Sequence, residues 1–126
     1  MISLDYRDKR PIYEQITEKL EKLIVCGALE SHAKMPSVRS LAIELSVNPN
    51  TIQRAYAQLE QDGYLYTVMG RGNFVSPDTA WKKGRTEAVL RELTEVLTKA
   101  YEAKVPKGDL QALLDRIYSK KEEDRV

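Results

Sequence analysis

Residues 36 to 59 constrain the fold more than any other stretch, because two short helical patterns stand there with only a tight turn between them. In the first pattern, apolar residues recur at the spacing of one helix face, and Ser37 can cap its free amides. That face consists of Val38, Leu41, Ala42 and Leu45. The periodicity breaks after Leu45, and then Asn48 is a good N-cap and Pro49 suits the first position of a new helix. We therefore expect two helices joined by a turn.

The second helix of the pair has one apolar stripe and one polar face. The stripe consists of Ile52, Ala55, Tyr56 and Leu59, and the polar face of Asn50, Thr51, Gln53, Arg54 and Gln58. A helix fits the major groove of B-DNA, where asparagine, glutamine, arginine and threonine can contact base edges. The helix pair alone fits two interpretations, a DNA-reading helix-turn-helix and an αα-hairpin with an ordinary solvated face.

A short β-hairpin is predicted directly after the pair. Gly63 is placed to end the second helix. Residues 64–68 contain β-formers, residues 69–72 are a glycine-punctuated turn, and residues 73–75 can return as a second strand before Pro77. Two helices followed by a hairpin with Arg71 at its tip predict a winged helix-turn-helix.

Four separated blocks of the sequence carry a family resemblance. They read KMPSVRSLA at 34–42, VNPNTIQRAY at 47–56, LEQDGYL at 59–65 and GRGNFV at 70–75. In order and spacing, over about residues 10 to 76, they resemble the GntR family of bacterial transcription regulators. The short all-helical tail further resembles the YtrA subfamily, whose members often control transporter operons. The resemblance implies a sequence-specific DNA-binding regulator, and we expect repression by steric occlusion of a promoter.

The resemblance also implies roles for individual residues. Arg39 falls where the family contacts the phosphate backbone or a guanine, and Gly70 matches a wing glycine that approaches the minor groove. Relatives carry basic residues where this chain has Pro49 and Gln53, and Gln53 suits adenine better. Arg54 is one step off the groove-facing line, so we expect it to contact phosphate. The complete expected DNA-binding set is Lys34, Ser37, Arg39, Asn48, Asn50, Thr51, Gln53, Arg54, Gly70 and Arg71.

The charge of the chain is local rather than global. The net charge is +1, and positions 1 to 77 hold 9 basic and 9 acidic residues, so there is no bulk field to attract nucleic acid. The three expected contact segments, 34–41, 48–54 and 67–73, nevertheless contain four cations and no aspartate or glutamate. Few phosphate contacts per subunit predict modest affinity for a monomer, and hence a need for dimerisation.

The segments before the helix pair are expected to complete a three-helix core. Residues 11–26 form an amphipathic helix that Gly27 ends, and Cys26 is interpreted as a small core residue. Residues 27–33 form a loop, where the family often has a short strand that pairs with the wing. His32 in this loop is expected to be solvated.

Pro77 marks the predicted boundary between two domains, a winged helix-turn-helix at 1–77 and a helical dimerisation region at 78–126. The fold class is therefore mainly α with a small β-hairpin wing (α+β). Two helical stripes in the tail are too wide to bury each other, so a second copy of the chain should cover them. The stripe residues are Val89, Leu90, Leu93, Val96, Leu97, Tyr101, Leu110, Leu113, Leu114 and Ile117. The alternative is that the tail folds back on the DNA-binding unit.

A symmetric dimer predicts an inverted-repeat operator with half-sites about 34 Å apart or a multiple of that. The competing class is a winged-helix adaptor that binds protein and does not read DNA. Trp81 is expected to pack between the two parts or to line a small-molecule site. Any effector would bind at the dimer interface or between the two parts, near Trp81, Tyr101 or Tyr118.

The sequence offers little material for catalysis. It has one histidine, one cysteine, no glycine-rich phosphate loop and no metal-ligand spacing, so neither an enzyme nor a cofactor is expected. We find no signal-peptide pattern and no segment long enough to cross a bilayer, which predicts a cytoplasmic protein without a membrane partner.

Overall fold

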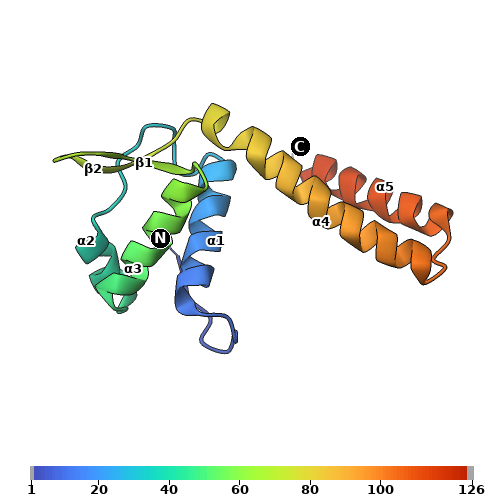
Figure 1. The fold of residues 1–126 in the computed structure, drawn as a ribbon, viewed down its shortest axis with the longest axis horizontal. Helices are drawn as coiled ribbons and strands as arrows, with labels where there is room; N and C mark the ends of the chain where they lie inside the picture. Colours follow the sequence, from blue (N-terminus) through green and yellow to red (C-terminus); the bar gives the residue numbers. More distant parts are fainter. Residues whose placement is uncertain (1, 125–126) are drawn as a thin grey trace. The chain divides into compact units, whose positions relative to one another are not determined.

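The computed structural model describes residues 2–124, which form five α-helices, one 3₁₀ turn and one β-hairpin (Figure 1). The chain divides into two compact units between Gly84 and Arg85. In chain order the elements are α1 (Ile12–Val25), α2 (Val38–Leu45), α3 (Pro49–Gln61), β1 (Leu65–Val68), β2 (Gly72–Val75), η1 (Asp78–Ala80), α4 (Lys82–Glu102) and α5 (Lys107–Asp124). This confirms the predicted fold class, mainly α with a small β-hairpin wing.

Side-chain caps begin α2 and α3 where the sequence predicted them. Ser37 Oγ accepts a hydrogen bond from the backbone N–H of Ser40 at 3.0 Å, and Asn48 Oδ1 accepts one from that of Asn50 at 2.8 Å. Between the two helices, Ser46 adopts a left-handed conformation with φ +55°. That residue reverses the chain within the short space that the sequence leaves for the turn.

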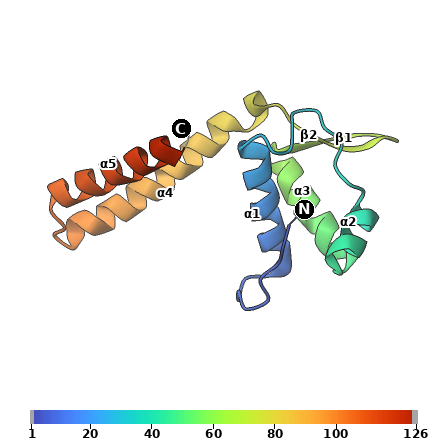
Figure 2. The same cartoon turned by 180° about the vertical axis from the view of Figure 1, so that it is seen from behind.

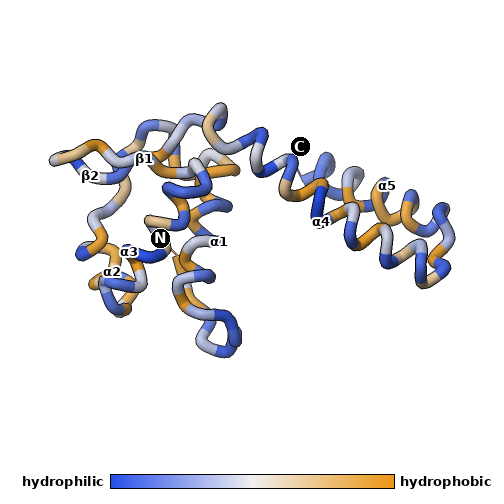
Figure 3. The backbone as a smooth tube through the Cα atoms, in the orientation of Figure 1, coloured by the Kyte–Doolittle hydropathy of each residue, from blue (hydrophilic) through white to orange (hydrophobic). Residues whose placement is uncertain are grey.

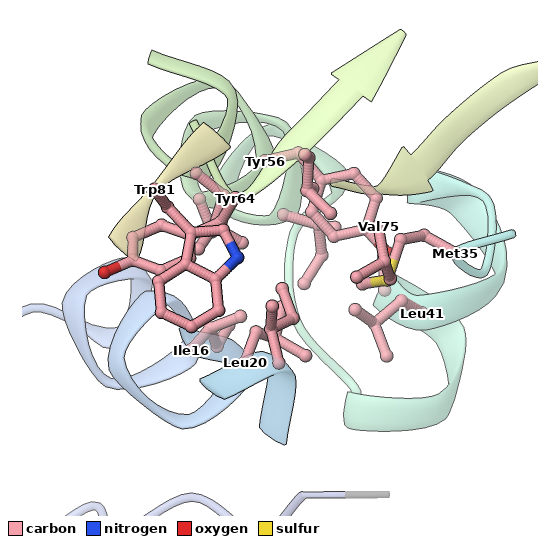
Figure 4. Close-up of a cluster of buried hydrophobic side chains, with 14 residues drawn as sticks. Ile16, Leu20, Met35, Leu41, Tyr56, Tyr64, Val75 and Trp81 are labelled. Atoms are coloured by element: carbon pink, nitrogen blue, oxygen red, sulfur yellow. The ribbon is translucent and has the colours of Figure 1, made fainter. Parts of the chain in front are cut away.

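Helices α1, α2 and α3 enclose the hydrophobic core of the first unit (Figure 4). Ile16 and Leu20 from α1 and Leu41 from α2 are wholly buried. Val75 of β2 closes the core together with three residues of the connecting segments, Met35, Tyr64 and Trp81. Helix α3 contributes four buried residues to this core, Ile52, Ala55, Tyr56 and Leu59. The core fixes α3 by its apolar stripe and so leaves the polar face of α3 on the outside.

Strands β1 and β2 pair antiparallel, with Leu65 opposite Val75 and Val68 opposite Gly72. The other edge of β2 pairs with the chain that leads into α2. His32 donates its backbone N–H to Val75 O, Met35 donates to Asn73 O, and the Val75 N–H donates to Ala33 O, at 2.7, 2.8 and 2.9 Å. This is the short pairing segment that the family resemblance implied.

Trp81 belongs to the first unit. Its ring stacks on Tyr64 at 5.5 Å between centroids, and only 8% of the residue is exposed. Its indole N–H, the one buried side-chain polar group without a partner within residues 2–124, lies inside the unit. The predicted domain boundary after Pro77 therefore lies a few residues before the division at Gly84, because η1 and Trp81 extend the packed region past the wing.

The interpretation of Cys26 as a core residue is wrong. The buried stripe of α1 ends at Ile24, and Cys26 is the exposed C-cap residue two positions further along the helix. Two residues correspond to a rotation of about 200° around a helix, which moves the side chain away from the buried face. The apolar neighbours of Cys26 in the sequence therefore did not indicate burial.

The second unit is an α-helical hairpin made of α4 from Arg85 onward and of α5, viewed from behind in Figure 2. No residue of either helix is buried, although both carry apolar side chains along one side. Figure 3 shows these apolar residues as orange segments along both helices. No helix within residues 2–124 combines the length and the apolar character that a bilayer crossing requires.

Candidate nucleic-acid interface

The N-terminal half of α3 presents polar side chains outward. Asn50 and Gln53 are exposed and Thr51 is half-buried, whereas Ile52, one residue before Gln53, is wholly buried. The first turns of α2 and α3 contain no acidic residue. Free backbone amides and the helix dipole make such helix starts favourable for anions.

Ser37 and Asn48 cap these helix starts. Ser37 Oγ accepts from the Ser40 backbone and donates to Ser40 Oγ at 2.8 Å. The Asn48 carbonyl oxygen is occupied by the cap, so its side-chain NH₂ is the group that remains for an outside acceptor. Each of these two residues therefore stabilises the start of its helix and also lies on the expected contact surface.

Lys34 is exposed on the approach to α2, and Arg39 is exposed in the first turn of α2. The backbone of Lys34 forms an isolated bridge with Phe74 of the wing, which places this residue at the junction of the wing and the helix pair. Tyr56 ties α3 to the same approach, because its hydroxyl donates to Pro36 O at 2.8 Å. Burial, with a further contribution from the charge of Glu44, raises the pKa of Tyr56 to about 12. The sequence indicated the apolar contact of Tyr56 but not this hydrogen bond.

The tip of the wing is an open turn that carries Gly70 and Arg71. Gly70 has φ +79° and nothing within 4 Å of the position where a Cβ would stand. Arg71 is exposed and its N–H closes the turn on Val68 O at 2.9 Å. Met69 beside them is 97% exposed, a tip residue that sequence reasoning did not single out.

Arg54 lies against α1 in this structure. Its guanidinium carbon is 3.8 Å from the centroid of the Tyr13 ring, a cation–π geometry that links α3 to α1. We expected Arg54 to contact phosphate from its place on the helix alone. The contact with Tyr13 gives it a structural role in the free protein, one that joins residues 41 positions apart in the sequence.

Opposite charges are separated around the first unit. The groove between α1 and α3 forms a hollow of about 350 Å³ whose lining includes the carboxylates of Glu14, Glu18, Glu21 and Asp62. The segments at the helix starts and the wing tip carry Lys34, Arg39 and Arg71 and no carboxylate. An anionic polymer would therefore be attracted to the helix starts and the wing rather than to the groove.

Four other residues named from the sequence lie outside this surface. His32 is exposed as expected, but its Nδ1 is also 2.9 Å from the Tyr66 hydroxyl. Tyr101 and Tyr118 are exposed on the second unit, whereas Trp81 is packed inside the first. The described residues thus do not gather these aromatic side chains into one site within either unit.

Comparison with known proteins gives three findings. The family model for bacterial regulatory proteins of the gntR family matches residues 12–75. The HTH-type transcriptional repressor YtrA of Bacillus subtilis is 36% identical over 107 residues, which cover 83% of this chain and 82% of that protein. A GntR family transcriptional regulator from Listeria monocytogenes has a similar structure, with a TM-score of 0.72, 32% identity and coverage of 90% of this chain and 98% of that one.

The solved relatives include complexes with operator DNA. The DNA-binding domain of AraR in complex with operator ORE1 aligns with a TM-score of 0.52 and 30% identity, over 60% of this chain and 93% of that domain. The aligned fold is the winged-helix arrangement described above.

Proposed function

Because the chain belongs to the gntR family of bacterial regulatory proteins, we propose that it represses transcription by binding an inverted-repeat operator as a homodimer. The observation that carries the proposal is the surface at the starts of α2 and α3 and the wing tip, which is exposed, hydrogen-bonding and free of carboxylates. The name of the Bacillus subtilis relative, a repressor, supports repression over activation. Control of a transporter-type operon is proposed from the subfamily resemblance.

The individual contacts follow from the placement of each side chain. Gln53 and Asn50 on the exposed face of α3 enter the major groove, where both amides suit adenine. Arg39, Lys34, Asn48 and Thr51 hold phosphates beside it, and Ser37 contributes the capped start of α2. Gly70 lets the wing approach the minor groove, and Arg71 contacts phosphate there.

The second unit provides the proposed dimer interface. Large side chains along α4 and α5 remain exposed in the single chain, among them Leu93, Leu97, Leu114 and Ile117. Together with Leu110 and Leu113 they line an apolar hollow of about 360 Å³. Contiguous exposed apolar surface of this kind marks an interaction site, and a second copy supplies a matching face. The full proposed set is Val89, Leu90, Leu93, Val96, Leu97, Tyr101, Leu110, Leu113, Leu114 and Ile117.

A DNA-binding titration tests whether the protein binds DNA in a sequence-specific way. The protein is titrated against the region upstream of its own gene at two salt concentrations, alongside Arg39→Ala and the matched control Arg116→Ala in α5. We expect tight, salt-sensitive binding by the wild type and by the control. In Arg39→Ala, the affinity should fall and the negative slope of log K against log salt should become shallower by about 1 per subunit.

The dimer is tested separately by light scattering of Leu97→Asp, for which a monomer is expected. A wild-type protein that is folded and dimeric but binds no DNA at low salt would refute the reading function. That result would favour the adaptor alternative, in which the polar face of α3 meets a protein partner. A dimeric Leu97→Asp variant would refute the proposed interface.

A further inference from the structure

The chain before α1 forms a loop that is ordered by its own hydrogen bonds. Asp5 Oδ1 accepts the backbone N–H of Arg7 at 2.9 Å, and Asp8 Oδ1 accepts that of Arg10 at the same distance. The Asp8 N–H also donates to Asp5 O at 3.2 Å, which closes a turn. Residues 5–10 therefore form a defined protrusion at the start of α1.

A buried glutamine holds this loop in place. Gln15 of α1 is 1% exposed, and its side-chain oxygen accepts the N–H of Asp5 while its nitrogen donates to the carbonyl of Asp5, both at 3.0 Å. Lys19 donates to the carbonyl of Ser3, and Ile2 and Leu4 pack against the core. Burying a polar amide is costly unless its hydrogen bonds are made. In this protein both bonds of the Gln15 amide serve to fix an exposed loop.

The loop lies at the same end of the first unit as the start of α3. Arg54 of α3 is level with Tyr13 of α1, and Gln58 and Asp62 line one groove with residues 13–21 of α1, so the two helices run in the same direction. At 1.5 Å per residue, Pro49 extends about 7.5 Å beyond the level of Tyr13. The loop that precedes Tyr13 extends toward the same end, and Figures 1 and 2 both draw it there.

The exposed side chains of the loop are suited to DNA. The Arg7 side chain is 95% exposed and meets Asp5 only through a long contact of 3.4 Å at Nε. Lys9 is exposed and Tyr6 is 71% exposed. The other charges nearby are paired, because Arg10 bonds both Asp8 and Glu18.

We infer that the loop at residues 5–10 is a further DNA-contacting element, in which Arg7 and Lys9 contact backbone phosphates that flank the bases read by α3. The inference rests on the proposed function, since it requires the start of α3 to face the groove. The groove between α1 and α3 is lined by carboxylates, of which Glu18 is paired with Arg10 and Lys22, so phosphate is favoured at the loop over the groove.

The first test compares the salt dependence of DNA binding in a loop variant and a matched control. The loop variant is Arg7→Ala with Lys9→Ala, and the control is Lys120→Ala with Lys121→Ala, which removes the same charge from α5. The probe is a duplex that the wild-type protein selects from a random library. We expect the loop variant to make the negative slope of log K against log salt shallower by about 1.8 per subunit, at about 0.9 per phosphate, and the control to leave the slope unchanged. Base preference should stay the same, because phosphate contacts carry no sequence information directly.

A second test locates the loop on the DNA. Tyr6→Cys in a Cys26→Ser background accepts an iron–EDTA group, which should cut the selected duplex on the outer flanks of both half-sites. Gln15→Met, which keeps both cations but removes the two hydrogen bonds to Asp5, should reduce this cutting and weaken binding.

The outcomes separate the two proposals. If the wild type binds the duplex and the loop variant has the same salt slope, or if cutting falls outside the flanks, the inference about the loop is overturned and the proposed function stands. If the wild type selects no duplex at all, the proposed function fails and the inference fails with it.

Discussion

Replacing Gly63 by alanine should lower the free energy of unfolding by about 2–5 kcal/mol. Gly63 joins α3 to the wing with φ +86°, a conformation that costs an L-residue about 1–2 kcal/mol. An added Cβ would also stand 2.8 Å from Ala80 O, a backbone atom of η1. Relieving that overlap requires movement of the turn that carries Trp81 against Tyr64, and overpacking of this kind costs about 1–3 kcal/mol.

Gly70→Ala is the matched control for this prediction. Gly70 has φ +79° and open space around its Cβ position, so the substitution should cost only the conformational part. Both substitutions reduce the entropy of the unfolded chain equally, and that effect cancels in the difference. The difference of about 1–3 kcal/mol therefore isolates the overlap with Ala80.

The assay is urea unfolding followed by fluorescence. Trp81 is the only tryptophan, so its emission reports directly on the packing against Tyr64. Gly63→Ala should also alter the emission of the folded protein, whereas Gly70→Ala should not. Equal losses of stability in the two variants would refute the argument that the close approach of Ala80 constrains position 63.

Three further predictions concern α3. Asn48→Ala should cost about 0.5–2 kcal/mol in urea unfolding through loss of the cap, whereas Asn48→Asp should keep that stability but weaken DNA binding by repelling phosphate. A double-mutant cycle of Arg54→Met and Tyr13→Leu should give a coupling of about 0.5–1 kcal/mol, and additive losses would exclude the cation–π contact. The raised pKa of Tyr56 stabilises the fold fully below about pH 10, where an unfolded tyrosine begins to ionise, and this stabilisation is lost as the pH rises toward about 12. The urea midpoint of the wild type should therefore fall more steeply over that range than that of Tyr56→Phe.

Local signals in the sequence predicted the elements of the first unit well. Ser37 and Asn48 cap their helices, and Gly27 and Gly63 follow helix ends with positive φ, because these preferences depend on a few neighbouring residues. The apolar stripe of α3 likewise follows from helical periodicity, and the outward face of Asn50 and Gln53 follows from that stripe.

Contacts between distant segments could not be predicted in this way. The Arg54–Tyr13 contact and the stacking of Trp81 on Tyr64 join residues whose pairing leaves no periodic signal. Cys26 was misjudged because apolar neighbours in sequence indicate burial only when they share a helix face. The tether between Gln15 and Asp5 is similarly invisible, since glutamine on an amphipathic helix is usually exposed.

The edges of β2 have a consequence for how this domain can change over evolution. One edge is paired with β1 and the other with residues 32–35, so the strand itself is fixed between two neighbours. The tip from Met69 to Arg71 lies beyond both pairings, and the hydrogen bond from Arg71 N–H to Val68 O closes it. Residues can therefore be inserted or exchanged at the tip with little cost to the fold, since exposed loop tips tolerate such change. The wing tip is the part of the domain in which a new DNA preference can arise while the rest stays intact.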